Sequence, residues 1–212
     1  MKYGFFASIL LVVAFASGAA RGQDTYQEGI AYQAVTPEQP TSTKNKIEVI
    51  ELFWYGCPHC NKFEPFLERW QKTKADYVEF TRMPAILREE WTIHARTFYA
   101  AEALGVMDKF HTPFFTAIHA HKRKLDTEEA IAAFFGEIGV SKDDFTKAFH
   151  SFSVDAKTRR ALEMSRRYGI NGTPSVIVNG KYRTDGTICN CSFTEVLNIV
   201  DFLAEKEHKA KP

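Results

Sequence analysis

The stretch VIELFWYGCPHC, residues 49–60, decides the fold of this chain. It begins with an almost unbroken apolar run, which predicts a buried, central and parallel strand over residues 47–55. A helix-like stretch follows directly and covers residues 58–74. Cys57 and Cys60 therefore lie where a buried strand meets the start of a helix, which is the arrangement of a thiol–disulfide centre.

The position of Cys57 explains how such a centre becomes reactive. The unsatisfied backbone N–H groups at a helix N-terminus carry partial positive charge, so a thiolate is stabilised there. Pro58 suits the first helical position because an N–H would have no partner at that point. His59, protonated or donating a hydrogen bond, is expected to stabilise the anion further. A stabilised thiolate favours the reduced form, so the disulfide would oxidise other thiols.

A zinc site is the alternative for these cysteines. Cys-x-x-Cys is half of a tetrahedral site, and Cys189 and Cys191 provide a second close pair. Structural zinc sites favour two or more residues between paired ligands, and Cys57 lies where reactivity is expected. We therefore favour redox chemistry and expect no metal. His119 and His121 lack the i, i+4 spacing of a helical metal site, so they are not expected to bind one either.

Residues 1–20 have the pattern of a secretory signal peptide. Lys2 supplies a positive charge, residues 5–15 are almost wholly apolar, and cleavage is expected after Ala19 or Ala20. An uncleaved membrane anchor is the alternative, although the apolar segment is short for a span, which needs about twenty residues. The mature protein is expected to be exported and soluble, in an oxidising compartment where disulfides persist.

The composition suits one domain, or one domain that carries a substantial insertion. Of the 212 residues, 45% are hydrophobic, which is ample for a core. Most of the 18 phenylalanines are expected in that core. The formal net charge of +1 gives no electrostatic basis for nucleic acid or an anionic membrane surface as a partner.

The rest of the sequence predicts a sheet interrupted by helices. Asn179 and Gly180 join two short strands as a hairpin, and Ser192 with Glu195 forms a capping box that opens the last helix. An extended segment at 29–35 is expected to add an edge strand. The other predicted elements are strands at 77–83, 175–178 and 181–183 and helices at 89–104, 110–121, 127–138, 141–150 and 155–168. This order predicts a two-part α/β protein with an all-helical insertion.

The Cys57-Pro58-His59-Cys60 motif, its preceding strand and Gly172-Thr173-Pro174 resemble the DsbA family of bacterial periplasmic dithiol oxidases. The resemblance covers nearly all of the chain after the signal peptide. It implies a thioredoxin fold, built from residues 21–85 and 153–212, with an all-helical domain inserted at 86–152.

The resemblance also implies an activity and partners. Proteins of this family donate their disulfide, here Cys57–Cys60, to newly exported polypeptides with free thiols. A quinone-linked inner-membrane protein of the DsbB type then reoxidises them. We accordingly expect a periplasmic monomer with no cofactor besides the redox-active disulfide, and a mixed disulfide at Cys57 during each transfer.

The family pattern implies a cis peptide bond between Thr173 and Pro174. Cis bonds occur almost only before proline and usually in tight turns, and Gly172 supplies turn character. The loop would lie against the cysteine pair. The Thr173 backbone is expected to pair with an extended substrate as an added strand.

Three charged residues, Glu51, Glu64 and Arg82, match family positions that influence proton handling near Cys60. A carboxylate within a central strand must be paired or remain protonated, so Glu51 could take the proton of Cys60. The alternative for Glu51 is a buried ion pair with Arg82 or a lysine. Glu64 is a weaker candidate because its place on a helix is also compatible with facing solvent.

Cys189 and Cys191 depart from the family pattern. A disulfide across one intervening residue closes a small ring, so it would be strained and easily reduced. One hypothesis is a second, noncatalytic redox pair. The alternative is two free or structurally bridged cysteines in the turn before the last helix.

Two other functions compete with the oxidase. A disulfide isomerase or reductant would share the fold, although such isomerases usually carry a dimerisation domain that the short arm before residue 47 does not provide. A redox-inactive peptide-binding chaperone would not need both Cys57 and Cys60, and Cys60→Ser would leave its activity intact.

Overall fold

The computed structural model describes residues 25–211; the predicted signal peptide lies outside them and stays a prediction. Along residues 25–211, no helix combines the length and apolar character that crossing a bilayer requires. The elements are β1 (Gln33–Ala34), β2 (Ile47–Phe53), α1 (Pro58–Thr73), β3 (Val78–Pro84), the 3-10 turn η1 (Glu89–Trp91), α2 (Thr92–Ala103), α3 (Met107–His119), α4 (Glu128–Glu137), α5 (Lys142–Phe149), α6 (Phe152–Arg167), β4 (Ser175–Val178), β5 (Tyr182–Thr184) and α7 (Phe193–Ala210).

The strands form one mixed sheet in the order β1-β5-β4-β2-β3. β2 is buried along its whole length, as predicted, but it is parallel only to β3 and runs antiparallel to β4. β4 continues into β5 through a hairpin, where Asn179 and Gly180 take positive φ angles of 52° and 68° and reverse the chain. β1 adds the predicted edge strand beside β5.

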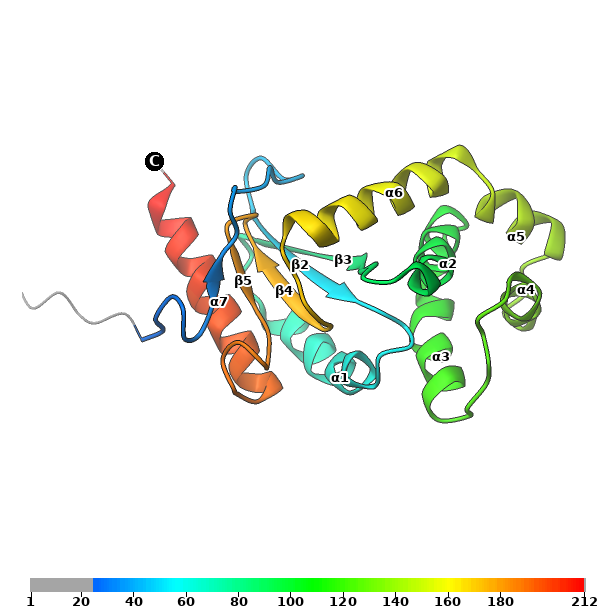
Figure 1. Cartoon of the computed structure of the whole chain (residues 1–212), viewed down its shortest axis with the longest axis horizontal. Helices are drawn as coiled ribbons and strands as arrows, with labels where there is room; N and C mark the ends of the chain where they lie inside the picture. Colours follow the sequence, from blue (N-terminus) through cyan, green and yellow to red (C-terminus); the bar gives the residue numbers. More distant parts are fainter. Residues whose placement is uncertain (1–24, 212) are drawn as a thin grey trace, which may run out of the picture.

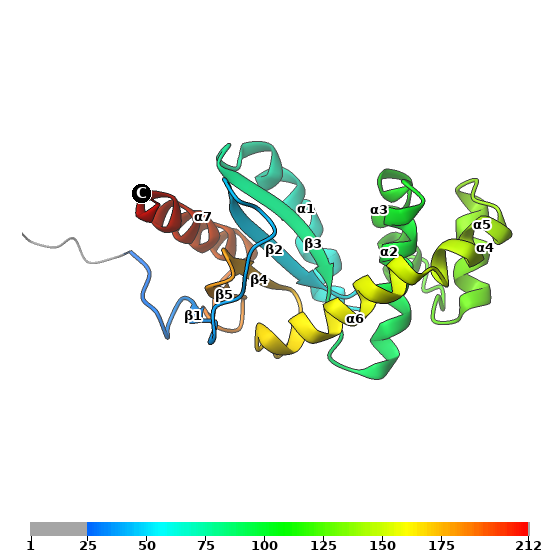
Figure 2. The same ribbon diagram turned by 90° about the horizontal axis from the view of Figure 1, so that it is seen from above.

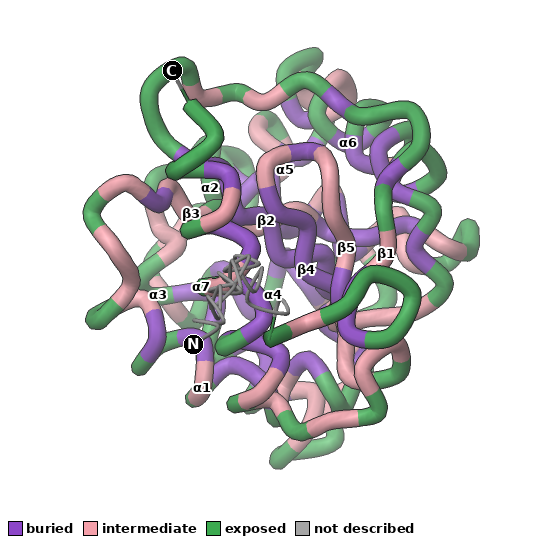
Figure 3. The backbone as a smooth tube through the Cα atoms, turned by 90° about the vertical axis from the view of Figure 1, so that its left-hand side faces the viewer, coloured by how far each residue is buried: buried purple, intermediate pink, exposed green. Residues whose placement is uncertain are grey.

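Helices cover both faces of this sheet (Figure 1). α1 and α7 pack on one face, and the C-terminal half of α6 packs on the other. The first interface contains Phe63, Leu67 and Trp70 of α1 with Val196, Val200 and Leu203 of α7. The second contains Met164 and Tyr168 of α6 against Ile50, Leu52 and Ile177 of the sheet. Figure 3 shows β2 and β4 as buried strands between these layers.

Helices α2 to α5 form a separate group at one end of the sheet (Figures 1 and 2). Their core is rich in aromatic side chains and also holds Phe53, the last residue of β2, and Tyr55 from the turn that follows. α6 belongs to both parts, because Val154 and Ala161 pack in the helical core while its last turns lie on the sheet. The helical insertion is thus present. Its boundaries at residues 86 and 152 stay a prediction.

The helix ends follow the predicted signals with small shifts. Ser141 and Ser192 each accept a backbone N–H as N-caps, of α5 and α7. Three starts were placed wrongly: the helix expected from residue 89 begins at Thr92 after η1, the helix expected from residue 110 begins at Met107, and the helix expected from residue 155 begins at Phe152. In the last case Ser151 accepts the Val154 N–H and caps the helix.

Candidate active site

Cys57 and Cys60 lie at the start of α1, directly after the buried strand β2. Cys57 is the N-cap residue, with extended backbone angles, and Pro58 occupies the first turn, as predicted. The Cys57 N–H donates to the Trp54 carbonyl at 2.9 Å, which holds the turn from strand to helix. Both cysteines are free thiols in this structure, with Cys57 7% exposed and Cys60 fully buried. Only Cys57 is therefore open to an incoming sulfur.

The two thiols differ sharply in acidity. A hydrogen bond from the Cys60 thiol, the Thr173 hydroxyl and the backbone N–H groups of Cys60 and His59 together outweigh burial and lower the pKa of Cys57 to about 5. Burial, and then the same contact with Cys57, raises the pKa of Cys60 well above its ordinary value. The thiol of Cys57 makes no capping bond, but its anion can accept the helix N–H groups.

His59 acts on Cys57 through its backbone. Its N–H helps to lower the Cys57 pKa, while its side chain is exposed and lines the groove described below. The expected contribution of the imidazole ring stays a prediction. The backbone effect follows from the position of His59 in the first turn of the helix and does not depend on residue type.

Thr173 and Pro174 form the loop that faces Cys57. The peptide bond between them is cis, as the resemblance implies. The Thr173 carbonyl accepts the Cys57 S–H at 3.2 Å in the thiol form. When the sulfur is an anion the carbonyl no longer has a proton to accept, and the Thr173 hydroxyl instead stabilises the charge. The loop thus contacts the reactive sulfur in both protonation states.

Glu51 lies beside Arg82, as the ion-pair alternative expects, and its role in proton transfer to or from Cys60 stays a prediction. It is fully buried in β2, and its Oε2 accepts from Arg82 Nε at 3.2 Å. Its Oε1 has no hydrogen-bond partner among the described residues. Burial first, and then the charge of Glu64, raises the pKa of Glu51 to about 8, although Arg82 acts in the opposite direction. At neutral pH Glu51 therefore holds a proton, with one oxygen free to pass it on.

Glu64 is buried, so the expectation that it could simply face solvent is wrong. Its Oε2 accepts from Arg82 Nη2 at 2.8 Å and its Oε1 lies 3.3 Å from His111 Nε2. Burial alone would raise the Glu64 pKa. The hydrogen bond from His111 and the charge of Arg82 outweigh burial, so the pKa is lowered. Arg82 thus joins two carboxylates, of which Glu64 is ionised and Glu51 is protonated at neutral pH.

Sequence reasoning missed His111 and Tyr55, which extend this buried network into the helical group. Burial lowers the pKa of His111, so the ring is neutral, and burial raises the pKa of Tyr55, so its hydroxyl keeps its proton. The Tyr55 hydroxyl lies 2.8 Å from His111 Nδ1. We assign Tyr55 as donor to Nδ1, which leaves the proton on Nε2 to bond Glu64. No sequence spacing signals this contact, because its members come from three different elements.

A groove of about 870 Å³ opens beside the cysteine pair. It lies between the first turns of α1, the Thr173–Pro174 loop and the turn that precedes α7. Its walls carry apolar and polar side chains, among them His59, Phe66, Thr173, Pro174, Cys191 and Phe193. Such a groove can accept an extended peptide whose cysteine reaches Cys57.

Cys189 and Cys191 form a disulfide in the turn before α7, so the alternative of two free thiols does not describe this structure. Within residues 25–211, no three His, Cys, Asp or Glu side chains gather as a metal ion would require. The four cysteines accordingly do not form one cluster, and the zinc alternative finds no site in the described part of the chain.

Comparison with known proteins identifies the family of this chain. The DsbA-like thioredoxin domain family matches residues 48–190. The thiol:disulfide interchange protein DsbA of Pseudomonas aeruginosa is 38% identical over 202 residues, 95% of both chains. That of Azotobacter vinelandii is 41% identical over 184 residues, 86% of this chain and 85% of the other.

Solved structures agree with the sequence relatives. The crystal structure of Pseudomonas aeruginosa DsbA superposes with a TM-score of 0.83 at 38% identity and covers 88% of this chain and 97% of its own. The oxidoreductase DsbA from Xylella fastidiosa gives 0.79 at 33% identity, with 85% and 96% covered. The chain belongs to the DsbA family of thiol:disulfide oxidoreductases with a thioredoxin fold.

Proposed function

We propose that this thiol:disulfide oxidoreductase works as an oxidase, which donates the Cys57–Cys60 disulfide to polypeptide thiols. The observation that carries the proposal is the difference between its two sulfurs. The Cys57 pKa is lowered to about 5, whereas the Cys60 pKa is raised. A stable Cys57 thiolate stabilises the reduced enzyme, so its disulfide gives up its bond to a substrate readily.

The transfer proceeds in two exchanges. A substrate thiolate attacks the Cys57 sulfur, the S–S bond breaks, and Cys60 leaves and takes up a proton. Glu51, protonated at neutral pH and with one free oxygen, is the proposed donor of that proton. A second substrate thiolate then attacks the substrate sulfur of the mixed disulfide, and Cys57 leaves as a stable anion. Low leaving-group pKa speeds this last step.

The substrate is proposed to be an extended segment of an unfolded polypeptide. The groove beside Cys57 offers room for it, and the backbone at Thr173 can pair with it as a strand. Arg183 and Asp185 give the groove wall both signs of charge, so no single charge class of peptide is favoured. This suits a protein that acts on many clients.

The cellular setting follows from the family resemblance. Residues 1–20 are proposed to direct export to the periplasm and to be removed there. Reoxidation is proposed to come from a quinone-linked inner-membrane protein of the DsbB type, and the enzyme is proposed to act as a monomer. The proposed domain boundaries are 21–85 and 153–212 for the thioredoxin part and 86–152 for the helical part.

Equilibration with glutathione buffers tests the oxidase assignment. The fraction of reduced Cys57–Cys60, measured by alkylation and mass mapping, gives the reduction potential, and we expect a value well above that of a reductant. A potential near that of thioredoxin, about −270 mV, would contradict the proposal and favour the reductant. A peptide-binding chaperone makes a different prediction, because its activity would survive Cys60→Ser.

A further inference from the structure

The Cys189–Cys191 disulfide is a redox group that the mechanism above leaves unused. It closes across one residue, Asn190, whose φ of 48° turns the backbone into the left-handed region. Asparagine tolerates this conformation better than most residues. The small ring closes a very short loop, for which a disulfide gives the folded state little entropic stabilisation.

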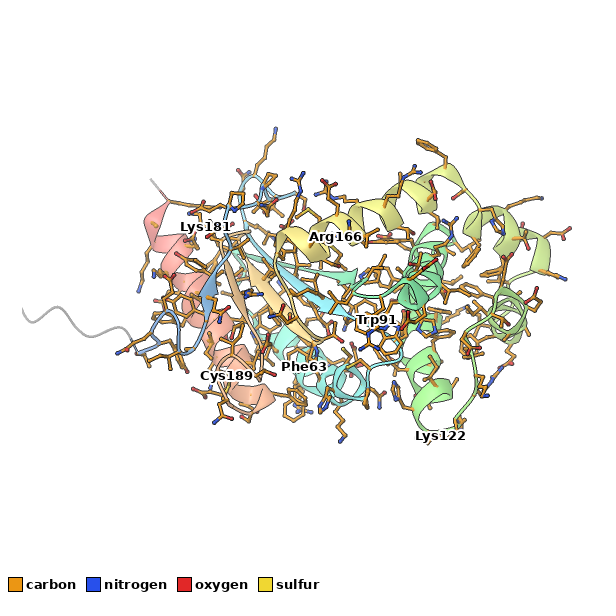
Figure 4. The ribbon with its side chains drawn as sticks, in the orientation of Figure 1. Phe63, Trp91, Lys122, Arg166, Lys181 and Cys189 are labelled. Carbon is orange, nitrogen blue, oxygen red and sulfur yellow. A yellow bond between two sulfur atoms is a disulfide. The ribbon has the colours of Figure 1, made fainter. Side chains whose placement is uncertain are left out.

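The disulfide lies on the wall of the peptide groove. Cys191 lines the same groove as His59 and Thr173, the residues that flank the reactive sulfur of Cys57. Both cysteines of the pair are half-buried, and Cys191 is open to a peptide in the groove. Figure 4 labels Cys189 in the turn at the start of α7. Exposed, weakly stabilised disulfides are the ones that exchange with thiols.

Polar contacts connect this turn to the loop at Cys57. Asp185 Oδ1 accepts the N–H groups of Thr187 and Ile188 at 2.8 Å each, which shapes the turn before Cys189. Its Oδ2 lies 3.4 Å from the Ser175 hydroxyl, which donates to the Gly172 carbonyl at 2.9 Å. The turn and the Thr173–Pro174 loop therefore form one continuous groove wall.

We propose that Cys189–Cys191 is a second thiol–disulfide exchange site, which oxidises thiols of a polypeptide held in the groove. A substrate thiolate attacks the Cys191 sulfur, the S–S bond breaks, and Cys189 leaves as a thiolate and takes up a proton from solvent. A second substrate thiolate attacks the substrate sulfur of this mixed disulfide, and Cys191 leaves as a thiolate. The substrate is oxidised by two electrons, and the pair becomes a dithiol.

Cys191 is the attacked sulfur because it faces the groove, whereas Cys189 is not among the groove-lining residues. Cys191 also directly precedes Ser192, the N-cap of the 18-residue helix α7. Partial positive charge at that end favours the thiolate that leaves in the second exchange.

The established family activity supplies the oxidant that restores the pair. The Cys191 thiolate attacks Cys57 in the disulfide form of a second copy, where Cys60 leaves, and Cys189 then displaces Cys57 from the mixed disulfide. The Cys189–Cys191 bond returns, and the second copy becomes a dithiol. This regeneration step alone rests on the proposed function.

The double variant Cys57→Ser/Cys60→Ser isolates the second site. The full-length variant, prepared with its Cys189–Cys191 disulfide, is mixed with excess of a synthetic peptide that carries two cysteines. We expect one peptide disulfide per chain and two new alkylatable thiols, which map to Cys189 and Cys191. The matched control adds Cys189→Ser/Cys191→Ser and is expected to form none. Absence of both products in the double variant would overturn the proposal.

The unaltered oxidised chain provides a second measurement that does not depend on a variant that folds. After reaction with the same peptide, mass mapping counts new thiols separately at the two pairs. Four new thiols support the second site; two, both at Cys57 and Cys60, overturn it. Two new thiols at Cys189 and Cys191 alone would instead count against the proposed function and leave this inference standing.

Discussion

The acidity of the two active-site thiols depends on where Cys57 and Cys60 lie at the N-terminal end of α1. Cys57 is the N-cap of α1, and Cys60 lies one turn later and is fully buried. The hydrogen bond between them has opposite effects on the two groups, because it stabilises the Cys57 anion and retains the Cys60 proton. It is also the largest cause of the low Cys57 pKa, ahead of the helix N–H groups.

Removal of the Cys60 donor tests this order of causes. In Cys60→Ala we expect the Cys57 pKa to rise from about 5 by at least about one pH unit, because the anion loses its strongest hydrogen bond. The measurement is the pH dependence of Cys57 alkylation or of thiolate absorbance. Cys60→Ser is the matched control, since its hydroxyl keeps a donor and should keep the pKa low. Equal pKa values in the two variants would rule out the hydrogen bond as the cause.

Glu51 is the residue that we propose as the proton donor to Cys60. With a pKa raised to about 8, it holds a proton at neutral pH and loses it in mild alkali. In Glu51→Gln we expect the first exchange to slow on the order of a hundredfold, the usual size of a lost general acid. We also expect its rate to lose the decline above about pH 8 that deprotonation of Glu51 would impose.

Stopped-flow mixing of oxidised protein with a reduced peptide measures this rate. Glu79→Gln is the matched control, because Glu79 lies on the adjacent strand β3 in an exposed ion pair with Lys46, and its rate and pH profile should stay unchanged. A Glu51→Gln profile identical to that of the unaltered chain would mean that Cys60 exchanges its proton by another route.

At the scale of elements, local signals predicted most of the fold. An apolar run identified β2, the Asn179–Gly180 turn identified the β4–β5 hairpin, and the Ser192–Glu195 capping box identified the start of α7. The antiparallel pairing of β2 with β4 was not predicted, because a strand pattern records burial and not the direction of its neighbour.

The Cys57–Cys60 motif could be predicted from the local sequence. The Thr173–Pro174 loop and the positions of Glu51, Glu64 and Arg82 were identified through the family resemblance. The burial of Glu64 and the roles of His111 and Tyr55 were not, because their contacts join residues 47 and 56 positions apart along the chain. A charged residue on a predicted helix, such as Glu64, can face solvent or a buried partner, and the sequence alone does not show which side chains pack against it.

The hairpin that follows the Thr173–Pro174 loop gives a prediction at the scale of elements. Gly180 has a φ of 68°, and an added Cβ would clash with the Gln39 carbonyl oxygen. Gly180→Ala is therefore expected to lower the free energy of unfolding by about 1–3 kcal/mol. Gly136→Ala is the control: it lies within α4 with open space around it, and alanine should stabilise that helix by about 0.5–1 kcal/mol. Urea titration of both variants measures the difference, and equal effects would contradict the clash.

At the scale of the whole molecule, the helical insertion contributes His111 to the buried network around Glu51 and Glu64. The buried chain Glu51–Arg82–Glu64–His111–Tyr55 runs from the central strand through α1 into α3. Phe53, the last residue of β2, and Tyr55, from the turn that follows, lie in the aromatic core of the insertion. The charge state of the carboxylates near the cysteines thus depends on how the insertion packs against the sheet.

The free energy of unfolding should differ between the reduced and oxidised forms, because only the reduced form carries the Cys57 thiolate. The Cys57 pKa in the reduced fold, about 5, lies below the value of about 8.5 for a thiol in an unfolded chain. Because the folded pKa is the lower one, the anion stabilises the reduced fold fully above about pH 8.5, and this stabilisation is lost as the pH falls to about 5. The oxidised fold has no such proton. Denaturant unfolding of both forms measures the effect. The free energy of unfolding of the reduced form should fall relative to that of the oxidised form as the pH is lowered from about 8.5 to about 5. A difference between the two free energies that stays constant from pH 4 to 8 would mean that Cys57 titrates like an ordinary thiol.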